Sequence, residues 1–274
     1  MKYKRFSLNV DYSRANRDKL PNFTPALDAY LLDNPVNPYP RKAVIICPGG
    51  AYSFTAALEG EPVAQQFLSA GIQSFVLWYS TAPAVFPMSL MELATAVRFV
   101  RQHAAEWNID PDGIAVLGFS AGGHLAASLA NFWQMDFLND FVGSSPEEIR
   151  PNYSILCYPV ITSGPKAHRN SIENLCRGLD DDFYDFVSLE NRVSPDTPPT
   201  FIWSTWTDDA VPVDNTLYYV DALYQNNISC EAHIFHEGKH GLSLGTDEVS
   251  HNKDQVNTYV GPWIRLCINW FLHF

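Results

Sequence analysis

The stretch "GFSAGGH", residues 118–124, decides the fold predicted for this chain of 274 residues. It places Ser120 between Gly118 and Gly122, after an apolar run and before an alanine-rich, helix-forming run. A strand that turns sharply into a helix presents a serine hydroxyl above a sheet, and the flanking glycines permit that tight backbone. Glycine-serine turns also occur in ordinary loops, so the motif indicates a nucleophile only if the chain supplies its partners.

The first partner is an acid that orients a base, and a turn of this kind places it between the serine and a histidine in the chain. The segment "STWTDDAVPV", residues 204–213, follows an expected strand and carries Asp208 and Asp209 side by side. Open α/β sheets place their sites beyond the carboxyl ends of such strands. Successive side chains point in different directions, so only one of the two acids orients the base.

The second partner is the histidine of "FHEGKHGLSL", residues 235–244. His240 lies on a loop after the last expected strand, which leaves room for one helix and one strand after the acid. His233 and His236 are rivals, although either also fits an ordinary structural histidine. His124 lies just after the turn at Ser120, in the first turn of the expected helix, where the positive end of the helix dipole disfavours a cation. It is expected to pack in the core or to support the site.

Backbone amides for an oxyanion are expected from two places. One is the residue after the nucleophile, Ala121, and the other is the loop "CPGGAY", residues 47–52, which follows a buried strand. Two glycines let this loop turn tightly, so that the amides of Gly50 and Ala51 face the site.

Around these motifs, short β-branched or aromatic runs alternate with amphipathic helical stretches. This alternation is typical of an α/β fold, a mostly parallel central sheet with helices on both faces. Strands are expected at residues 43–47, 74–78, 114–118, 154–158, 200–204 and 231–235, and helices at residues 61–69, 91–103, 121–132, 215–225 and 263–272. Pro111 and six further prolines are assigned to the connections.

The chain is expected to form a single domain over residues 1–274, because no linker or shift of composition divides it. Residues 136–151 and 163–194 carry aromatic residues, acids and prolines at no sustained period. They are expected to be irregular cap-like insertions over the carboxyl edge of the sheet, or plain surface loops.

Composition limits the possible partners. With 18 Lys+Arg against 30 Asp+Glu, the formal charge of −12 repels nucleic acid and anionic membranes. No apolar run approaches the roughly 20 residues that cross a bilayer, and the polar N-terminus lacks an export signal, so a soluble cytoplasmic protein is expected. Five cysteines without a CxxC pair indicate reduced thiols, and no metal or cofactor is expected. The oligomeric state, including a homo-oligomer, stays open.

Taken in order and at these separations, five segments resemble the α/β-hydrolases. More narrowly, they resemble the bacterial acetyl esterase and xylan-esterase-like branch, which is related to the hormone-sensitive-lipase esterases. The segments are "PGGAY" (48–52), "EGEPVA" (59–64), "GFSAGGHLAASLA" (118–130), "PPTFIWSTWTDDAVPVDNTL" (198–217) and "HIFHEGKHGLSL" (233–244).

The resemblance assigns residues to roles. The family's D-x-x-V-P step falls on Asp208, which makes it the acid, and its Gly-x-His-Gly falls on His240. Its His-Gly-Gly-Gly loop falls on residues 48–51, where Pro48 replaces the histidine and Ala51 the last glycine. Pro48 removes a polar side chain that anchors this loop in relatives, so the resemblance predicts a less rigid loop that keeps its donors.

The function implied is that of a serine carboxylesterase acting on short-chain, acetyl-type esters of small molecules, O-acetylated sugars among them. The resemblance implies that Ser120 forms an acyl-enzyme, with His240 as base and Asp208 orienting it. Tyr52 and Trp206 adjoin the site loops and are the aromatic residues expected to contact substrate.

Two other functions remain open. The same triad serves prolyl-oligopeptidase-like peptidases, but those proteins usually carry a large additional N-terminal domain, and only about 40 residues precede the first site strand here. A non-catalytic binding protein on a hydrolase scaffold is the alternative outside enzymes, because fold does not guarantee chemistry.

Overall fold

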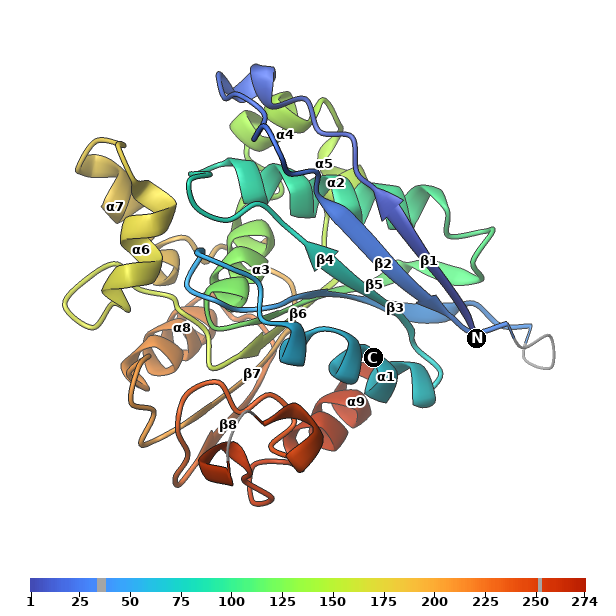
Figure 1. Ribbon diagram of the computed structural model, residues 1–274, viewed down its shortest axis with the longest axis vertical. Helices are drawn as coiled ribbons and strands as arrows, with labels where there is room; N and C mark the ends of the chain where they lie inside the picture. The colour runs from blue at the N-terminus through green and yellow to red at the C-terminus, as the bar shows by residue number, and fades with distance from the viewer. Residues whose placement is uncertain (34–37, 251–252) are drawn as a thin grey trace.

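One eight-stranded sheet forms the centre of the computed structural model, which describes residues 1–33, 38–250 and 253–274 (Figure 1). The spatial order of the strands is β1-β2-β4-β3-β5-β6-β7-β8. Their bounds are Lys2–Ser7 (β1), Ala26–Leu31 (β2), Arg41–Cys47 (β3), Gln73–Trp78 (β4), Ile109–Phe119 (β5), Tyr153–Cys157 (β6), Thr200–Thr205 (β7) and Cys230–Phe235 (β8). β2 pairs antiparallel with β1 and β4, and the other neighbouring strands are parallel.

The central strands are buried on both faces, which explains their continuous apolar runs. In β3, Val44, Ile45 and Ile46 are all fully buried, and successive side chains point to opposite faces. Ile45 belongs to one hydrophobic cluster, whereas Val44 and Ile46 belong to another. The sheet therefore separates two cores.

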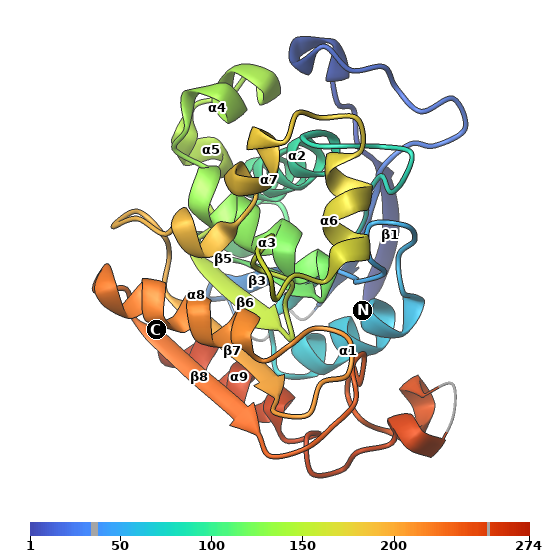
Figure 2. The ribbon, with the colours of Figure 1, turned by 90° about the vertical axis from the view of Figure 1, so that its left-hand side faces the viewer.

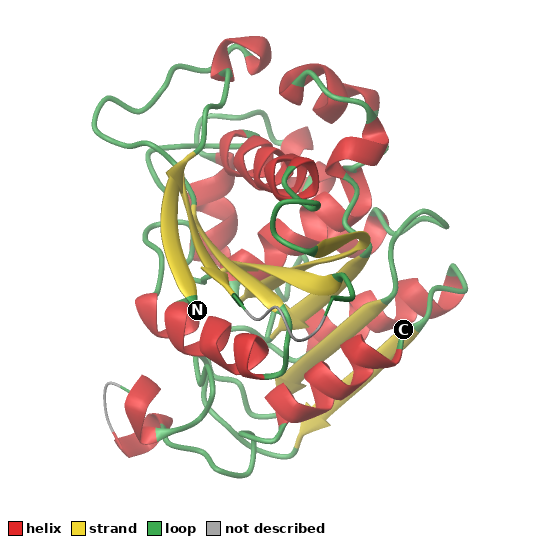
Figure 3. Ribbon diagram, turned by 90° about the vertical axis from the view of Figure 1, so that its right-hand side faces the viewer, coloured by secondary structure: helices red, strands yellow, loops and turns green. Residues whose placement is uncertain are grey.

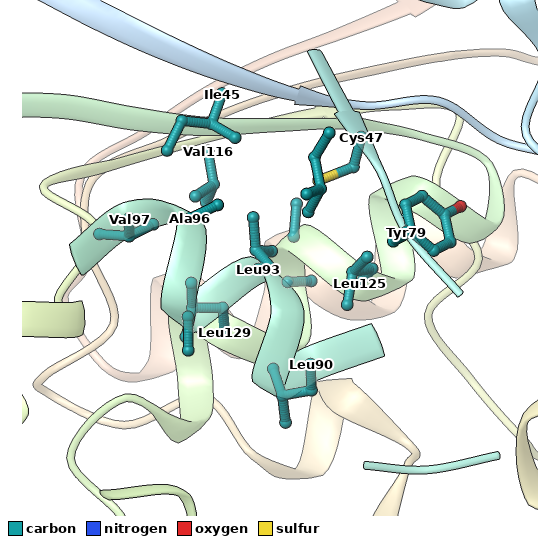
Figure 4. Close-up of a cluster of buried hydrophobic side chains, with 14 of the residues drawn as sticks. Ile45, Cys47, Tyr79, Leu90, Leu93, Ala96, Val97, Val116, Leu125 and Leu129 are labelled. Carbon is teal, nitrogen blue, oxygen red and sulfur yellow. The ribbon is translucent and has the colours of Figure 1, made fainter. Parts of the chain in front are cut away.

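Helices cover both faces of the sheet (Figure 3). α1 and α9 pack on the face of Val44, and α2, α3 and α8 pack on the face of Ile45 (Figure 1). On the latter face, Leu93 of α2 and Leu125 of α3 meet the strand side chains (Figure 4). These five helices span Glu61–Ser69 (α1), Met88–Gln102 (α2), Ala121–Phe132 (α3), Asp214–Gln225 (α8) and Trp263–His273 (α9).

The two segments expected to be irregular contain short helices. The first segment holds α4 (Asp136–Val142) and α5 (Pro146–Ile149), which pack beside α2. The second holds α6 (Arg169–Cys176) and α7 (Asp182–Phe186), which contact each other on the face of the molecule that is turned toward the viewer in Figure 2. Short 3-10 turns complete the structure at Tyr12–Ala15 (η1), Ala57–Glu59 (η2), Leu189–Asn191 (η3), Asp247–Val249 (η4) and Lys253–Gln255 (η5).

The predicted alternation of strands and helices is confirmed, with one correction inside it. β5 begins at Ile109, so Pro111 lies within a strand rather than in a connection. The pairing of β5 with β3 shifts register between Arg41 and Ala43, and such an irregularity tolerates a proline, which cannot donate to the ladder.

β1 and β2 were not predicted, because three cations interrupt β1 and an acid, Asp28, interrupts the apolar run of β2. The pair is held to the sheet by Asp28 of β2, whose side chain is almost fully buried. Its carboxylate pairs with the Arg5 guanidinium at 3.0 Å and accepts hydrogen bonds from the Tyr3 hydroxyl at 3.0 Å and the Trp78 indole at 2.7 Å. These contacts are tertiary, so the local sequence does not reveal them.

In the part of the chain that the structure describes, no helix has the length and apolar character that crossing a membrane requires.

Candidate active site

Ser120 occupies the turn between β5 and α3. Its backbone is left-handed, with φ 52° and ψ −117°, a conformation that costs a non-glycine residue about 1–3 kcal/mol and clusters at functional sites. The turn is held by hydrogen bonds from the Ser120 amide to the Cys157 carbonyl at 3.0 Å and from the Val160 amide to the Ser120 carbonyl at 3.0 Å. The surrounding structure therefore fixes the strained serine.

The glycines of the motif permit close packing of α3 on the sheet. A Cβ atom on Gly118 would lie 1.9 Å from the carbonyl oxygen of Gly122. A Cβ atom on Gly122 would lie 2.1 Å from the carbonyl oxygen of Cys47 in β3. Both contacts are with backbone that cannot rotate away, so any side chain at these positions would push the helix off the sheet.

Three side chains that are far apart in the sequence form one hydrogen-bonded line. His240 Nδ1 lies 2.8 Å from Asp208 Oδ2, and His240 Nε2 lies 2.8 Å from Ser120 Oγ. Because an ionised carboxylate only accepts, Nδ1–H donates to Asp208, which leaves Nε2 of the neutral ring to accept from the serine hydroxyl. This is the geometry of a nucleophile, a base and an orienting acid.

The two adjacent acids hold different parts of the same histidine. The Asp208 side chain is 1 % exposed, and its Oδ1 accepts hydrogen bonds from the amides of Ala210 at 2.9 Å and Val211 at 2.8 Å. Asp209 Oδ1 instead accepts the backbone amide of His240 at 3.0 Å. Asp208 thus orients the ring, while Asp209 holds the main chain.

The predicted oxyanion loop bends into the left-handed region beside the serine. Gly50 has φ 128°, and Ala51 and Tyr52 have φ near 55°. A Cβ atom on the preceding Gly49 would lie 3.0 Å from Ser120 Cβ, so the loop passes close to the hydroxyl. Within the described residues, the amides of Gly50, Ala51 and Ala121 donate to no backbone carbonyl. They are therefore available to an external acceptor.

The loop is anchored at three points even though Pro48 has no polar side chain. The Tyr79 hydroxyl donates to the Pro48 carbonyl at 2.5 Å, and the Gly49 amide donates to Glu59 Oε2 at 2.7 Å. The Asn174 side-chain amide of α6 donates to the Ala51 carbonyl at 2.9 Å. Other elements therefore supply anchors that Pro48 does not, and the lower rigidity expected of this loop stays a prediction.

A cavity of about 420 Å³ opens beside Ser120. One wall is apolar, and the polar side chains of Glu59, His168, His240 and Gln255 face the rest. The lining residues are Gly50, Ala51, Phe54, Thr55, Ala56, Ala57, Leu58, Glu59, Ser120, His168, His240, Gly241 and Gln255.

Neither of the aromatic residues expected to contact substrate is among these described lining residues. Tyr52 is 2 % exposed, and its hydroxyl lies 3.0 Å from Nδ1 of His124 beneath the loop. Trp206 is 60 % exposed on the surface, although its amide is bonded to Phe235 of β8. Phe54, which is also 60 % exposed, lies on the cavity wall instead.

His124 packs in the core. It is fully buried, and burial lowers its pKa to about 4, so the ring is neutral at physiological pH. Nε2 donates to the Val187 carbonyl at 2.9 Å, and Nδ1 therefore accepts from the Tyr52 hydroxyl. His233 and His236, the rivals of His240, lie at 2.9 and 4.0 Å from the acids Glu231 and Glu237.

The sequence analysis missed several side chains around the site. Glu59 and Asn174 anchor the oxyanion loop, Tyr158 packs against the His240 ring with centroids 5.0 Å apart, and His168 lines the cavity. Two signals were available for these residues. Glu59 lies in the segment 59–64 that resembles the family, and Tyr158 follows β6 directly, where the carboxyl ends of parallel strands form such sites. Among the described residues, no group of three or more His, Cys, Asp or Glu side chains is arranged to hold a metal ion.

Comparison with known proteins links this chain to esterases. The model of the BD-FAE family matches residues 27–223. The chain is 35 % identical over 255 residues to endo-1,4-beta-xylanase B of Butyrivibrio fibrisolvens, an alignment that covers 89 % of this chain and 39 % of that protein. It is 33 % identical over 238 residues to the acetylxylan esterase of Xylanibacter ruminicola, covering 84 % of this chain and 46 % of the relative. The chain thus spans less than half the length of either curated relative.

The chain is also similar to a solved structure of a related hydrolase over nearly the full length of both chains. The acetyl ester-xyloside bifunctional hydrolase of Caldicellulosiruptor lactoaceticus is 38 % identical, with a TM-score of 0.79. The match covers 92 % of this chain and 89 % of that one.

Proposed function

Because the chain belongs to the BD-FAE family, we propose that it is a serine carboxylesterase that hydrolyses short-chain, acetyl-type esters through an acyl-enzyme on Ser120. The observation that carries the proposal is the hydrogen-bonded line from Asp208 through His240 to Ser120, which ends at the cavity. A serine hydroxyl is a poor nucleophile unless a base removes its proton, and this line supplies the base.

The proposed reaction has two halves. Ser120 Oγ attacks the ester carbonyl carbon while His240 Nε2 takes its proton, and the carbonyl oxygen becomes an oxyanion that accepts from the amides of Gly50, Ala51 and Ala121. The intermediate collapses, the C–O bond to the alcohol breaks, and His240 returns the proton to the leaving alcohol. Water then attacks the acyl-enzyme by the same route, releasing the acid and free Ser120.

The lining of the cavity supports an ester that joins an alkyl acyl group to a hydroxylated alcohol. The cavity is about 420 Å³ and opens beside Ser120, with an apolar wall formed by Phe54, Ala57 and Leu58. An apolar wall suits an alkyl group, while polar side chains suit a hydroxylated alcohol such as a sugar. O-acetylated sugars are accordingly the substrate class we propose, and the names of the relatives point the same way.

The proposal is tested by substituting the nucleophile and varying the substrate. Ser120→Ala is expected to lower kcat at least about 10³-fold on p-nitrophenyl acetate, because no hydroxyl remains to attack. Wild-type protein is expected to prefer acetate over butyrate and octanoate, and to release acetate from acetylated xylo-oligosaccharide.

Ser69→Ala is the matched control, because Ser69 is exposed at the end of α1 and the variant should keep wild-type activity. Cleavage of an aminoacyl p-nitroanilide without ester hydrolysis would indicate a peptidase. Absence of both activities, with no labelling of Ser120 by a fluorophosphonate, would indicate a binding protein.

A further inference from the structure

A buried carboxylate lies beside the proposed site, and the acyl-transfer steps do not use it. Glu59 is the last residue of η2, is 3 % exposed, and contributes to the cavity wall near Ser120. A buried acid is costly unless its oxygens are hydrogen-bonded, so its bonding partners indicate what it does.

The first partner is the oxyanion loop. Glu59 Oε2 accepts the Gly49 amide at 2.7 Å. Gly49 directly precedes Gly50 and Ala51, whose amides are the proposed oxyanion donors, and it passes within contact distance of Ser120. At 2.7 Å the hydrogen bond from the Gly49 amide is well formed, so Glu59 fixes the position of the Gly49 peptide.

The second partner connects to the loop that carries the base. Glu59 Oε1 accepts the Tyr158 hydroxyl at 2.7 Å, and that hydroxyl accepts the Ser243 amide at 2.9 Å. Tyr158 packs edge-on against the His240 ring, and Ser243 Oγ donates to the Leu58 carbonyl at 2.8 Å. One carboxylate therefore ties together both backbone segments that flank Ser120.

From these contacts we infer that Glu59 is a positioning residue, which sets the distance between the oxyanion amides and the base by bonding Gly49 and Tyr158 at once. The inference deepens the proposed esterase function and rests on it. It also gives the anchor missing at Pro48 a replacement from a different element.

Glu59 holds both partners through its two carboxyl oxygens, each of which accepts one hydrogen bond. The pKa of this carboxyl is raised, because the effect of burial exceeds that of the hydrogen bonds from Tyr158 and Gly49, which lower it. Both oxygens accept hydrogen bonds from fixed donors, which favours the ionised form. Glutamine has nearly the same shape but only one acceptor oxygen. Its NH₂ group would either face the Gly49 amide and lose that contact, or face the Tyr158 hydroxyl, which would then have to turn and accept instead of donate.

Loss of the Glu59 contacts should destabilise the transition states and thereby lower kcat. An oxyanion forms in acylation and again in deacylation, so displaced amides slow whichever step limits kcat. The ground-state ester rests in the cavity and makes little use of these amides, so KM should change little.

The test compares Glu59→Gln and Tyr158→Phe with Glu61→Gln, an exposed acid two residues away, on p-nitrophenyl acetate. For Glu59→Gln we expect kcat to fall about 10- to 100-fold with KM within about threefold, and for Tyr158→Phe a smaller loss of the same kind. The inhibition constant of a trifluoromethyl ketone, which forms a tetrahedral adduct with the serine, should rise by the same factor as kcat/KM falls. Glu61→Gln should match wild type.

The outcomes distinguish a failure of the proposed esterase function from a failure of the inference about Glu59. A wild-type protein that hydrolyses no ester overturns the proposed function and the inference with it. The number of active sites in each variant is counted by fluorophosphonate titration. If Glu59→Gln then has the same activity per active site as wild type, the inference alone is overturned, even if the melting temperature falls. If Glu59→Gln does not fold, Tyr158→Phe decides, and unchanged kcat and inhibitor affinity in that variant contradict the inference.

Discussion

Asp208 and Asp209 are neighbours in the chain with the same chemistry and different tasks. Only Asp208 reaches the imidazole of His240, because the amides of Ala210 and Val211 turn its carboxylate inward. Asp209 reaches the backbone amide of His240 instead. The spacing to the Val-Pro pair indicated this choice through the resemblance alone, and the structure supplies its physical basis.

Substituting each acid by its amide separates the two tasks. We expect Asp208→Asn to lower kcat about 10³- to 10⁴-fold, because an amide NH₂ facing Nδ1 favours the tautomer whose Nε2 cannot accept the serine proton. Asp209→Asn keeps an acceptor oxygen for the His240 amide and should stay within about fivefold of wild type. Steady-state kinetics on p-nitrophenyl acetate measures both, and similar losses in the two variants would contradict these assignments.

At the scale of elements, α6 belongs to the site although its segment was expected to be irregular. Asn174 bonds the Ala51 carbonyl, and its own Oδ1 accepts from Arg177 at 2.7 Å. His168, directly before α6, lines the cavity. The segment thus contacts the predicted oxyanion loop and lines the cavity beside it.

Removing the Asn174 side chain tests this connection. A single neutral hydrogen bond contributes about 0.5–1.5 kcal/mol net, so Asn174→Ala should lower kcat/KM up to about tenfold. Glu173→Ala is the control, because Glu173 is an exposed residue of the same helix. Wild-type kcat/KM in Asn174→Ala would show that the Asn174 side chain does not support the loop.

At the scale of the molecule, two buried titratable groups on neighbouring helices act oppositely on stability. Glu92 of α2 is fully buried and accepts from the Tyr12 hydroxyl and from the Ser80 amide and hydroxyl. Burial raises its pKa to about 7, whereas burial lowers the pKa of His124 in α3 to about 4.

The signs follow from proton linkage. Between about pH 4 and 6.5 the unfolded chain binds a proton at His124 that the folded protein does not, so this residue's contribution to stability is lost as pH falls. Between about pH 4.5 and 7 the folded protein holds a proton on Glu92 that the unfolded chain releases, so this contribution is lost as pH rises. The two effects offset each other over most of this range.

Substituting one group should expose the other. We expect the stability of wild type minus that of His124→Gln to increase with pH by up to about 1.4 kcal/mol per unit between pH 4 and 6.5. The same difference for Glu92→Gln should decrease with pH between 4.5 and 7. Urea unfolding at half-unit pH steps measures both, and differences that are independent of pH would rule out these protonation states.

The sequence by itself determined the α/β fold with a mostly parallel sheet, which the sheet topology confirms, and the hydrolase family followed from the resemblance of five segments. It did so because apolar periodicity and the turn around Ser120 are local properties, which a run of a dozen residues displays completely. The candidate residues Ser120, Asp208 and His240 also follow one another in the chain order, serine, acid and histidine, that accompanies a turn of this kind. Their catalytic roles stay predictions.

Only the tertiary structure decided which side chains support that site. Glu59 meets Tyr158 across 99 positions, Asn174 meets Ala51 across 123, and Asp28 is buried only because β1 and β2 join the sheet edge. Tyr52 looked like a substrate contact beside its loop, yet the backbone turns it inward to His124. Such contacts depend on where distant segments meet when the two cores close, and no local pattern carries that information.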